Sequence, residues 1–113
     1  MIATTKTFPL DDYVVDVLLR DLIGHDRSSA AFLVYLFFWR RTRGSNLPAI
    51  RLSHRHIAEE TGLSKSAVQA ALRILHRRGF VKSTQRYETD TPEHQVLRPW
   101  ATPRRRTSKP PRT

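Results

Sequence analysis

The sequence contains no cysteine, and this absence removes several kinds of protein from consideration. Disulfide-stabilised folds, cysteine-ligated zinc sites and thiol nucleophiles are all excluded, so packing must stabilise the chain. Long apolar runs are missing as well. The longest, residues 30–39, has ten residues, whereas a membrane-spanning helix needs about 18 to 20. We therefore expect this run to form a buried helix and the protein to lack a membrane partner.

Acidic side chains are scarce in comparison with basic ones. The 113 residues include 20 Lys and Arg but only 10 Asp and Glu, which gives a formal net charge of +10. Residues 1–50 contain six basic residues against five Asp, whereas residues 51–113 contain fourteen against five. This length predicts one domain, and this asymmetry predicts a nearly neutral structural half followed by a half that meets a polyanion.

Signals for export and for catalysis are also missing. Residues 1–10 lack the charged start and apolar run of a signal peptide, so we expect a cytoplasmic protein. We find no Ser/His/Asp set, phosphate-cradling Gly loop or paired carboxylates that would indicate an enzyme. His54 and His56 point apart on a helix and lack a third ligand, so no metal site is predicted. We expect no cofactor and no small-molecule effector.

The first half of the chain predicts two helices. Apolar residues recur at helical spacing over residues 10–23, and Gly24 is expected to end that helix. A second helix, capped by Ser28 or Ser29, is expected over residues 29–43. It is apolar on all sides and must be covered by the first helix, of the same chain or of a second subunit. A brief strand is expected at residues 49–52.

The second half shows a shorter, more regular pattern. Ile57, Leu63, Val68 and Leu72 are spaced so that two crossing helices can bury one seam. Gly62 suits the turn between them, and Ser64 can cap the second helix. The predicted elements are a helix at 53–61, a turn at 62–63, a helix at 64–78 ended by Gly79, a strand at 80–87, a polar loop at 88–93 and a strand at 94–98.

Residues 52–72, LSHRHIAEETGLSKSAVQAAL, and residues 73–82, RILHRRGFVK, resemble winged helix-turn-helix DNA-binding proteins. The similar proteins are GntR-type and MarR-type regulators and related plasmid and phage proteins. The resemblance implies a mainly α fold with a small antiparallel β-hairpin and an extra N-terminal helix. We divide the chain into residues 1–27 with an amphipathic helix for possible dimerisation, the winged domain at 28–100, and a disordered basic tail at 101–113.

The resemblance implies a recognition helix that begins near Ser64. Its inward side chains should be Val68, Ala71, Leu72 and Leu75. The outward ones, expected in the major groove, are Lys65, Ser66, Gln69, Ala70 and Arg73. Gln69 suits adenine and Arg73 suits guanine, because each offers a two-pronged contact.

Other cations are expected to contact phosphates. They are Arg55, His56, Arg77, Lys82 and Arg86, with Arg104, Arg105 and Arg106 of the tail. Arg77 and Arg78 at the helix end equally suit the helix dipole, and the tail equally suits a solvated segment. The acidic loop 88–93 argues against deep insertion of a wing tip.

Sequence-specific binding of double-stranded DNA by a transcriptional regulator, a repressor, is the function that these features favour. A plasmid or phage replication or partition protein that binds origin DNA stays open, as does a winged-helix module for protein or RNA that exposes residues 35–39. We also predict a homodimer through the first two helices, which would set two recognition helices about 34 Å apart.

Overall fold

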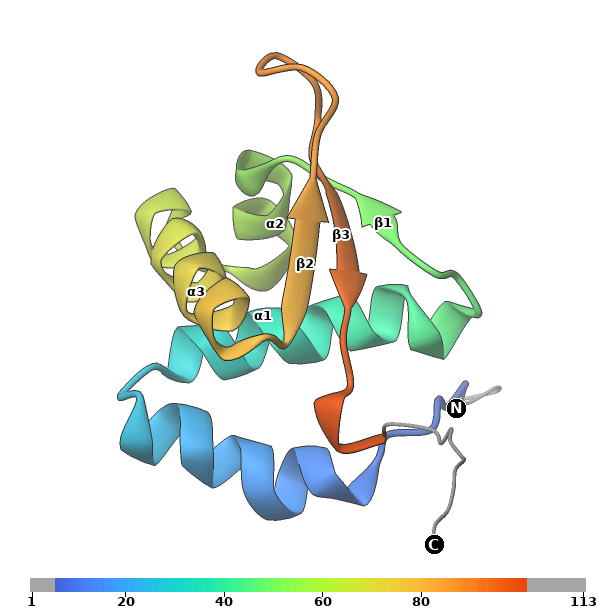
Figure 1. Cartoon of the computed structure of the whole chain (residues 1–113), viewed down its shortest axis with the longest axis vertical. Helices are drawn as coiled ribbons and strands as arrows, with labels where there is room; N and C mark the ends of the chain where they lie inside the picture. Colours follow the sequence, from blue (N-terminus) through green and yellow to red (C-terminus); the bar gives the residue numbers. More distant parts are fainter. Residues whose placement is uncertain (1–5, 102–113) are drawn as a thin grey trace, which may run out of the picture.

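The computed structural model describes residues 6–101 (Figure 1). A helical segment over residues 12–25, here called the N-terminal segment, contains two π-helical turns and precedes the labelled helices. The elements in chain order are η1 Val14–Leu18, η2 Asp21–His25, α1 Ser29–Arg41, η3 Arg43–Ser45, β1 Ile50–Arg51, α2 His54–Thr61, α3 Lys65–Arg78, β2 Val81–Thr84, β3 Glu93–Val96 and η4 Pro99–Ala101.

The N-terminal segment lies along α1 of the same chain (Figure 1). Val14, Leu18 and Leu22, spaced by four residues, are completely buried. One chain thus covers α1 with its own first helix. The prediction that Gly24 ends this helix is wrong, because Gly24 lies within η2. The chain turns instead at Arg27, whose φ of 56° is left-handed.

Helix α1 is the centre of the molecule. The Ser28 hydroxyl caps its start by accepting a hydrogen bond from the Ala31 N–H. The helix ends at Arg41, two residues earlier than predicted, because the buried Thr42 hydroxyl donates to the Phe38 carbonyl and the chain continues as the 3₁₀ turn η3. Its buried side chains are Ala31, Phe32, Val34, Tyr35, Phe38 and Trp39.

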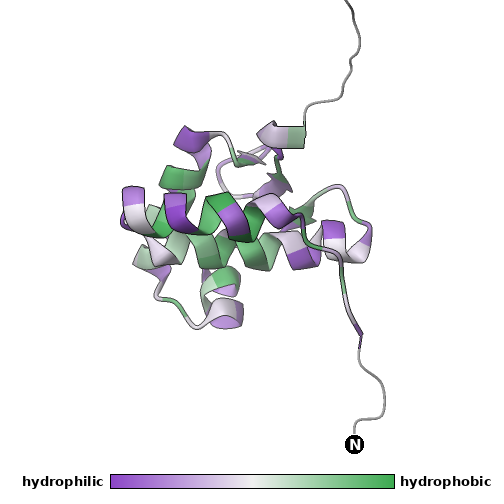
Figure 2. Ribbon diagram, turned by 90° about the horizontal axis from the view of Figure 1, so that it is seen from below, coloured by the Kyte–Doolittle hydropathy of each residue, from purple (hydrophilic) through white to green (hydrophobic). Residues whose placement is uncertain are grey.

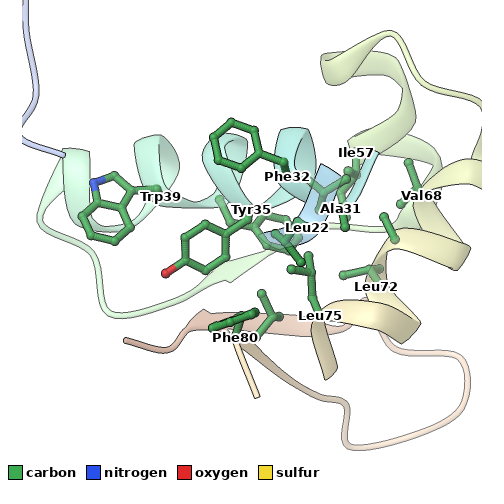
Figure 3. Packing of buried hydrophobic residues seen from close by; sticks show 14 of the residues in the cluster. Leu22, Ala31, Phe32, Tyr35, Trp39, Ile57, Val68, Leu72, Leu75 and Phe80 are labelled. Carbon is green, nitrogen blue, oxygen red and sulfur yellow. The ribbon is translucent and has the colours of Figure 1, made fainter. Parts of the chain in front are cut away.

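One hydrophobic core joins the N-terminal segment, the three α-helices and the sheet. Figure 3 shows Ile57 of α2 and Val68, Leu72 and Leu75 of α3 turned toward Leu22 and α1. Viewed from the side of the N-terminal segment, hydrophobic residues gather where the helices meet and hydrophilic ones lie at the edges (Figure 2). Among residues 6–101, no helix is both long enough and apolar enough to span a bilayer.

The three strands form an antiparallel sheet in the order β1-β3-β2. Ser83 lies opposite His94 in the β2–β3 hairpin, and His94 also lies opposite Ile50 of β1. Both hairpin strands are shorter than predicted. The Gln85 amide donates hydrogen bonds to the carbonyls of Tyr87, Glu88 and Asp90, so the chain curls into a loop at that point.

The start and the end of the described chain are fastened together, in what we call the Asp11 clasp. The Asp11 carboxylate accepts hydrogen bonds from Arg98 (2.6 and 2.9 Å) and from the Trp100 indole (3.0 Å). Trp100 stacks on Tyr13 with ring centroids 4.5 Å apart. This clasp lies at the end of the molecule opposite the β2–β3 loop (Figure 1). The mainly helical fold with a small antiparallel sheet confirms the predicted fold class.

Candidate nucleic-acid interface

Helices α2 and α3 are joined by a short turn, and nearby residues determine where each helix begins or ends. The Ser53 hydroxyl caps α2 by accepting from the His56 N–H, and the Ser64 hydroxyl caps α3 by accepting from the Ala67 N–H. Between them, Gly62 takes φ 82°, a left-handed value at which any side chain would be strained. These serines and this glycine fix where one helix stops and the next begins.

The predicted seam between the two helices is present. Ile57, Val68 and Leu72 are buried at 2% exposure or less, and Leu63 packs against them half-buried. The inward face of α3 consists of Val68, Ala71, Leu72 and Leu75, as predicted. Because these four side chains fix the rotation of α3, they also determine which side chains face solvent.

The outward face of α3 is basic and polar. Lys65, Ser66 and Arg73 are exposed, and Gln69 and Ala70 are half-buried at its margin. The helix contains no carboxylate, and within residues 6–101 neither Lys65 nor Arg73 forms an ion pair. The structure therefore brings together the five residues that the sequence assigned to the groove.

Gln69 is not alone on this face. Its amide nitrogen lies 3.5 Å from Nδ1 of His54, the first residue of α2. Burial, together with the positive charge of Lys65, lowers the pKa of His54 below its usual value of 6.5. His54 is therefore neutral at pH 7 and can accept a hydrogen bond. The sequence pattern did not indicate this contact, which crosses between two helices.

A chain of hydrogen bonds connects α3 to the sheet. His94 is 1% exposed, stacks on Phe38, and lies 3.0 Å from the Leu52 carbonyl through Nε2. Since a carbonyl only accepts, Nε2 of His94 carries the proton and Nδ1 accepts from the Ser83 hydroxyl at 2.7 Å. Ser83 then accepts from His76 at 2.7 Å. Burial lowers the pKa of His94, which matches this neutral arrangement.

The hairpin loop forms one wall of a cleft beside the recognition helix. The cleft, of about 330 Å³, lies between the start of α3, with Lys65 and Gln69, and the loop residues Glu88 and Asp90. The loop projects beyond the rest of the molecule (Figure 1). Its tip is acidic, whereas the exposed cations Lys82 and Arg86 lie closer to the strands.

The remaining predicted phosphate contacts have different surroundings. Arg55 is exposed with an ion pair to Glu59 at 3.4 Å, and His56 lies 4.0 Å from Glu60. Arg77 is exposed, and like Lys82 and Arg86 it forms no ion pair in the described part of the chain.

Arg78, next to Arg77 at the end of α3, is bound to the N-terminal segment. It pairs with Asp26 at 2.6 Å and with Asp21, and its guanidinium lies over the Phe80 ring. These ion pairs favour a structural role for Arg78, in which its charge holds the end of α3 to the N-terminal segment. Arg104, Arg105 and Arg106 lie outside the described residues. Within those residues no group of three His, Cys, Asp or Glu is placed to hold a metal ion.

Comparison with protein families identifies the helix-turn-helix region. Residues 51–82, which run from β1 through both helices into β2, match the family model of winged helix-turn-helix DNA-binding domains. Neither the curated proteins nor the solved structures gave a match to this chain. The family match confirms the resemblance stated from the sequence and covers the elements that carry the basic face.

Proposed function

We propose that this winged helix-turn-helix DNA-binding protein reads specific sequences of double-stranded DNA through α3 in the major groove and acts as a transcriptional repressor. The observation that carries the proposal is the outward face of α3. It has no carboxylate, its Lys65 and Arg73 have no ion-pair partner in the described chain, and Gln69 lies between them. Lys and Arg side chains that have no carboxylate partner can bind phosphates, and Arg can also bind guanine through two hydrogen bonds.

The loop between β2 and β3 supports contact along the DNA backbone more than insertion into the minor groove. Glu88 and Asp90 would repel phosphates at the tip, whereas Arg86 at its base and Lys82 in β2 would attract them. A backbone contact of this kind positions the recognition helix without reading bases. Specificity would then come from α3.

The test is selection of bound duplexes from a random pool, followed by titration of Gln69→Ala and Arg73→Ala. Each substitution should reduce the discrimination between selected and random duplexes by about 1–3 kcal/mol, as expected when a two-pronged base contact is removed. Circular dichroism should be unchanged, because neither side chain belongs to the core. A selected pool with no shared sequence, or full discrimination in both variants, would contradict the proposal.

Genomic footprinting separates a repressor from a replication or partition protein with the same fold. Protection of a promoter would support repression, and protection of repeated sites at an origin would support the alternative. The protein or RNA module needs an exposed aromatic run at residues 35–39. Tyr35, Phe38 and Trp39 are at most 1% exposed, so this surface is not available.

The homodimer forms a second part of the proposal. Val15 and Ile23 are 50% and 40% exposed, and Leu19 lies between them at the same spacing of four. This exposed stripe, beside the buried Val14, Leu18 and Leu22, is wider than a helix that has already docked on α1 needs. An isologous contact between two such stripes would pair two chains on a palindromic site.

Sedimentation with Ile23→Glu tests the dimer, since Ile23 lies on the surface. Leu18 is unsuitable because it is completely buried and its substitution would unfold the monomer. We expect a dimer for the unmodified chain at tens of micromolar and a monomer for the variant. A monomeric unmodified chain would end the dimer proposal.

A further inference from the structure

We propose that His54 is a positioning residue that sets the orientation of the Gln69 amide, so that the base preferred opposite Gln69 depends on the protonation of His54. The inference rests on the proposed function, in which Gln69 reads a base. It adds a second residue, on the other helix of the motif, and a dependence on pH. The observation that supports it is the contact between His54 of α2 and Gln69 of α3.

The geometry places the two side chains at one edge of the interface. His54 begins α2 directly after its capping serine, and Gln69 stands on the second turn of α3. The Gln69 amide nitrogen and His54 Nδ1 are 3.5 Å apart, and both side chains are half-buried. They line one shallow cleft with Leu72, Arg73 and His76. The Gln69 amide therefore has a protein partner on one side and solvent, or DNA, on the other.

With His54 neutral, the hydrogen-bond roles follow from chemistry. Nδ1 accepts one N–H of the Gln69 amide, when the ring proton is on Nε2. The amide keeps its carbonyl oxygen and its second N–H for the ligand. That pair of one acceptor and one donor matches N6–H and N7 of adenine. Neutral His54 thus selects the amide orientation that reads adenine.

With His54 protonated, the same contact requires the opposite amide orientation. Nδ1 then carries a proton and can only donate, so it attracts the Gln69 carbonyl oxygen. The amide turns over, so that its N–H group, a donor, takes the place that its carbonyl oxygen had beside the base. Guanine N7 and O6 or thymine O4 accept from such a group, and adenine loses its advantage.

The charges that face His54 place this change below neutral pH. Lys65 on α3 and burial lower its pKa. His76 on α3 and His94 on β3 also interact electrostatically with His54, and both have lowered pKa values because of burial. Arg73 lines the same cleft, and Arg55 on α2 with Glu88 and Asp90 on the loop lines the neighbouring one. We therefore expect adenine preference at pH 7 and its loss as the pH falls through the lowered pKa of His54.

The experiment uses the full chain and four duplexes that differ only at one base pair. The varied position is the one at which the protein loses its base preference when Gln69 is replaced by Ala. At pH 7.5, His54→Ala should reduce the preference for adenine about two- to tenfold, the range for removal of one hydrogen bond. His25→Ala, which removes an exposed histidine of the N-terminal segment, is the control and should retain the preference. His54→Lys, which only donates, should favour guanine or thymine at pH 7.5 and at lower pH.

The outcomes separate the two proposals. If Gln69→Ala loses the preference while His54→Ala retains it, His54 does not position the amide and this inference fails, with the proposed function intact. If Gln69→Ala retains full specificity, its reading of a base fails and the inference falls with it. An unmodified chain that stays folded by circular dichroism and has the same base preference at pH 7.5 and at a pH where NMR shows His54 protonated would overturn the dependence on protonation.

Discussion

Two groups of arginines in this molecule are in opposite situations. At the end away from the hairpin loop, Arg98 is held by Asp11 and Arg78 by Asp21 and Asp26. On the recognition face, Arg73 and Arg77 have no carboxylate partner within residues 6–101. The residue type is the same, but one group holds the fold together and the other is available to a ligand.

The difference shows where the excess positive charge of the second half of the chain is neutralised and where it is not. The carboxylates of these three ion pairs come from the first half of the chain, and their two arginines come from the second. Part of the basic excess of the second half is therefore neutralised within the fold. Positive charge alone does not identify a nucleic-acid contact; the position of the carboxylates decides which arginines are available.

Neighbouring residues at the end of α3 allow the largest test of this comparison. Arg78→Ala leaves the carboxylate of Asp26, whose side chain is 7% exposed, without its guanidinium partner. We expect the free energy of unfolding to fall by about 2–4 kcal/mol, as for a broken buried ion pair. Urea denaturation at pH 7 measures this.

Arg77→Ala is the matched control, one residue away. Its stability should stay within about 0.5 kcal/mol of the unmodified chain. Its affinity for all duplexes should fall, with a log–log salt slope smaller by about 0.9 because one phosphate is no longer bound. If Arg77→Ala destabilised the protein as much as Arg78→Ala, the division between the two groups would be incorrect.

Asp11→Asn should have the next largest effect, on stability and its pH dependence. Burial opposes ionisation of Asp11, but the hydrogen bonds from Trp100 and Arg98 and the charge of Arg98 lower its pKa below 3.8. The ionised clasp therefore stabilises the fold above pH 3.8 and is lost as the pH falls through the folded pKa. We expect Asp11→Asn to cost about 1–2 kcal/mol at pH 7.

The pH dependence of the free energy of unfolding tests the ionised clasp more directly than its value at pH 7. Between pH 6 and pH 3 the unmodified chain should lose stability, and Asp11→Asn should lose less over the same interval in urea titrations. An equal loss in both proteins would show that the clasp contributes nothing through ionisation of Asp11.

Removal of residues 103–113 should have the smallest effect on the fold and on specificity. This basic segment lies outside the described residues, and the sequence predicts phosphate contacts from Arg104, Arg105 and Arg106. We expect weaker binding to all duplexes alike and a salt slope smaller by about 0.9 for each phosphate that the segment would otherwise neutralise. Salt-dependent binding titrations measure the slope, and an unchanged slope would show that the segment does not meet DNA.

Local features of the sequence predicted most of the helix-turn-helix. Gly62, Ser64 and Gly79 act within a few residues of their own positions, so the end of α2 and both ends of α3 could be read directly. The inward face of α3 followed from helical periodicity in the same way. The solvent-facing side of α3 was therefore predictable without the fold.

Contacts between distant parts of the chain were not predictable in this way. Arg98 meets Asp11 across 87 residues, and His94 reaches the Leu52 carbonyl across 42. Neither partner has a local pattern that indicates the other. The N-terminal segment adopts π-helical turns and continues past Gly24, because packing on α1, a property of the assembled core, overrides the local preference of glycine.

The Asp11 clasp also affects the tryptophan fluorescence of this protein. The sequence has two tryptophans, and both lie at this end of the molecule. The Trp39 indole donates to the Pro9 carbonyl at 2.8 Å, and Trp100 lies on Tyr13 beside Asp11. Intrinsic fluorescence therefore reports whether Asp11 and Tyr13 remain in contact with Arg98 and Trp100. Emission that shifts before helical circular dichroism is lost would identify the clasp as the first part of the fold to open.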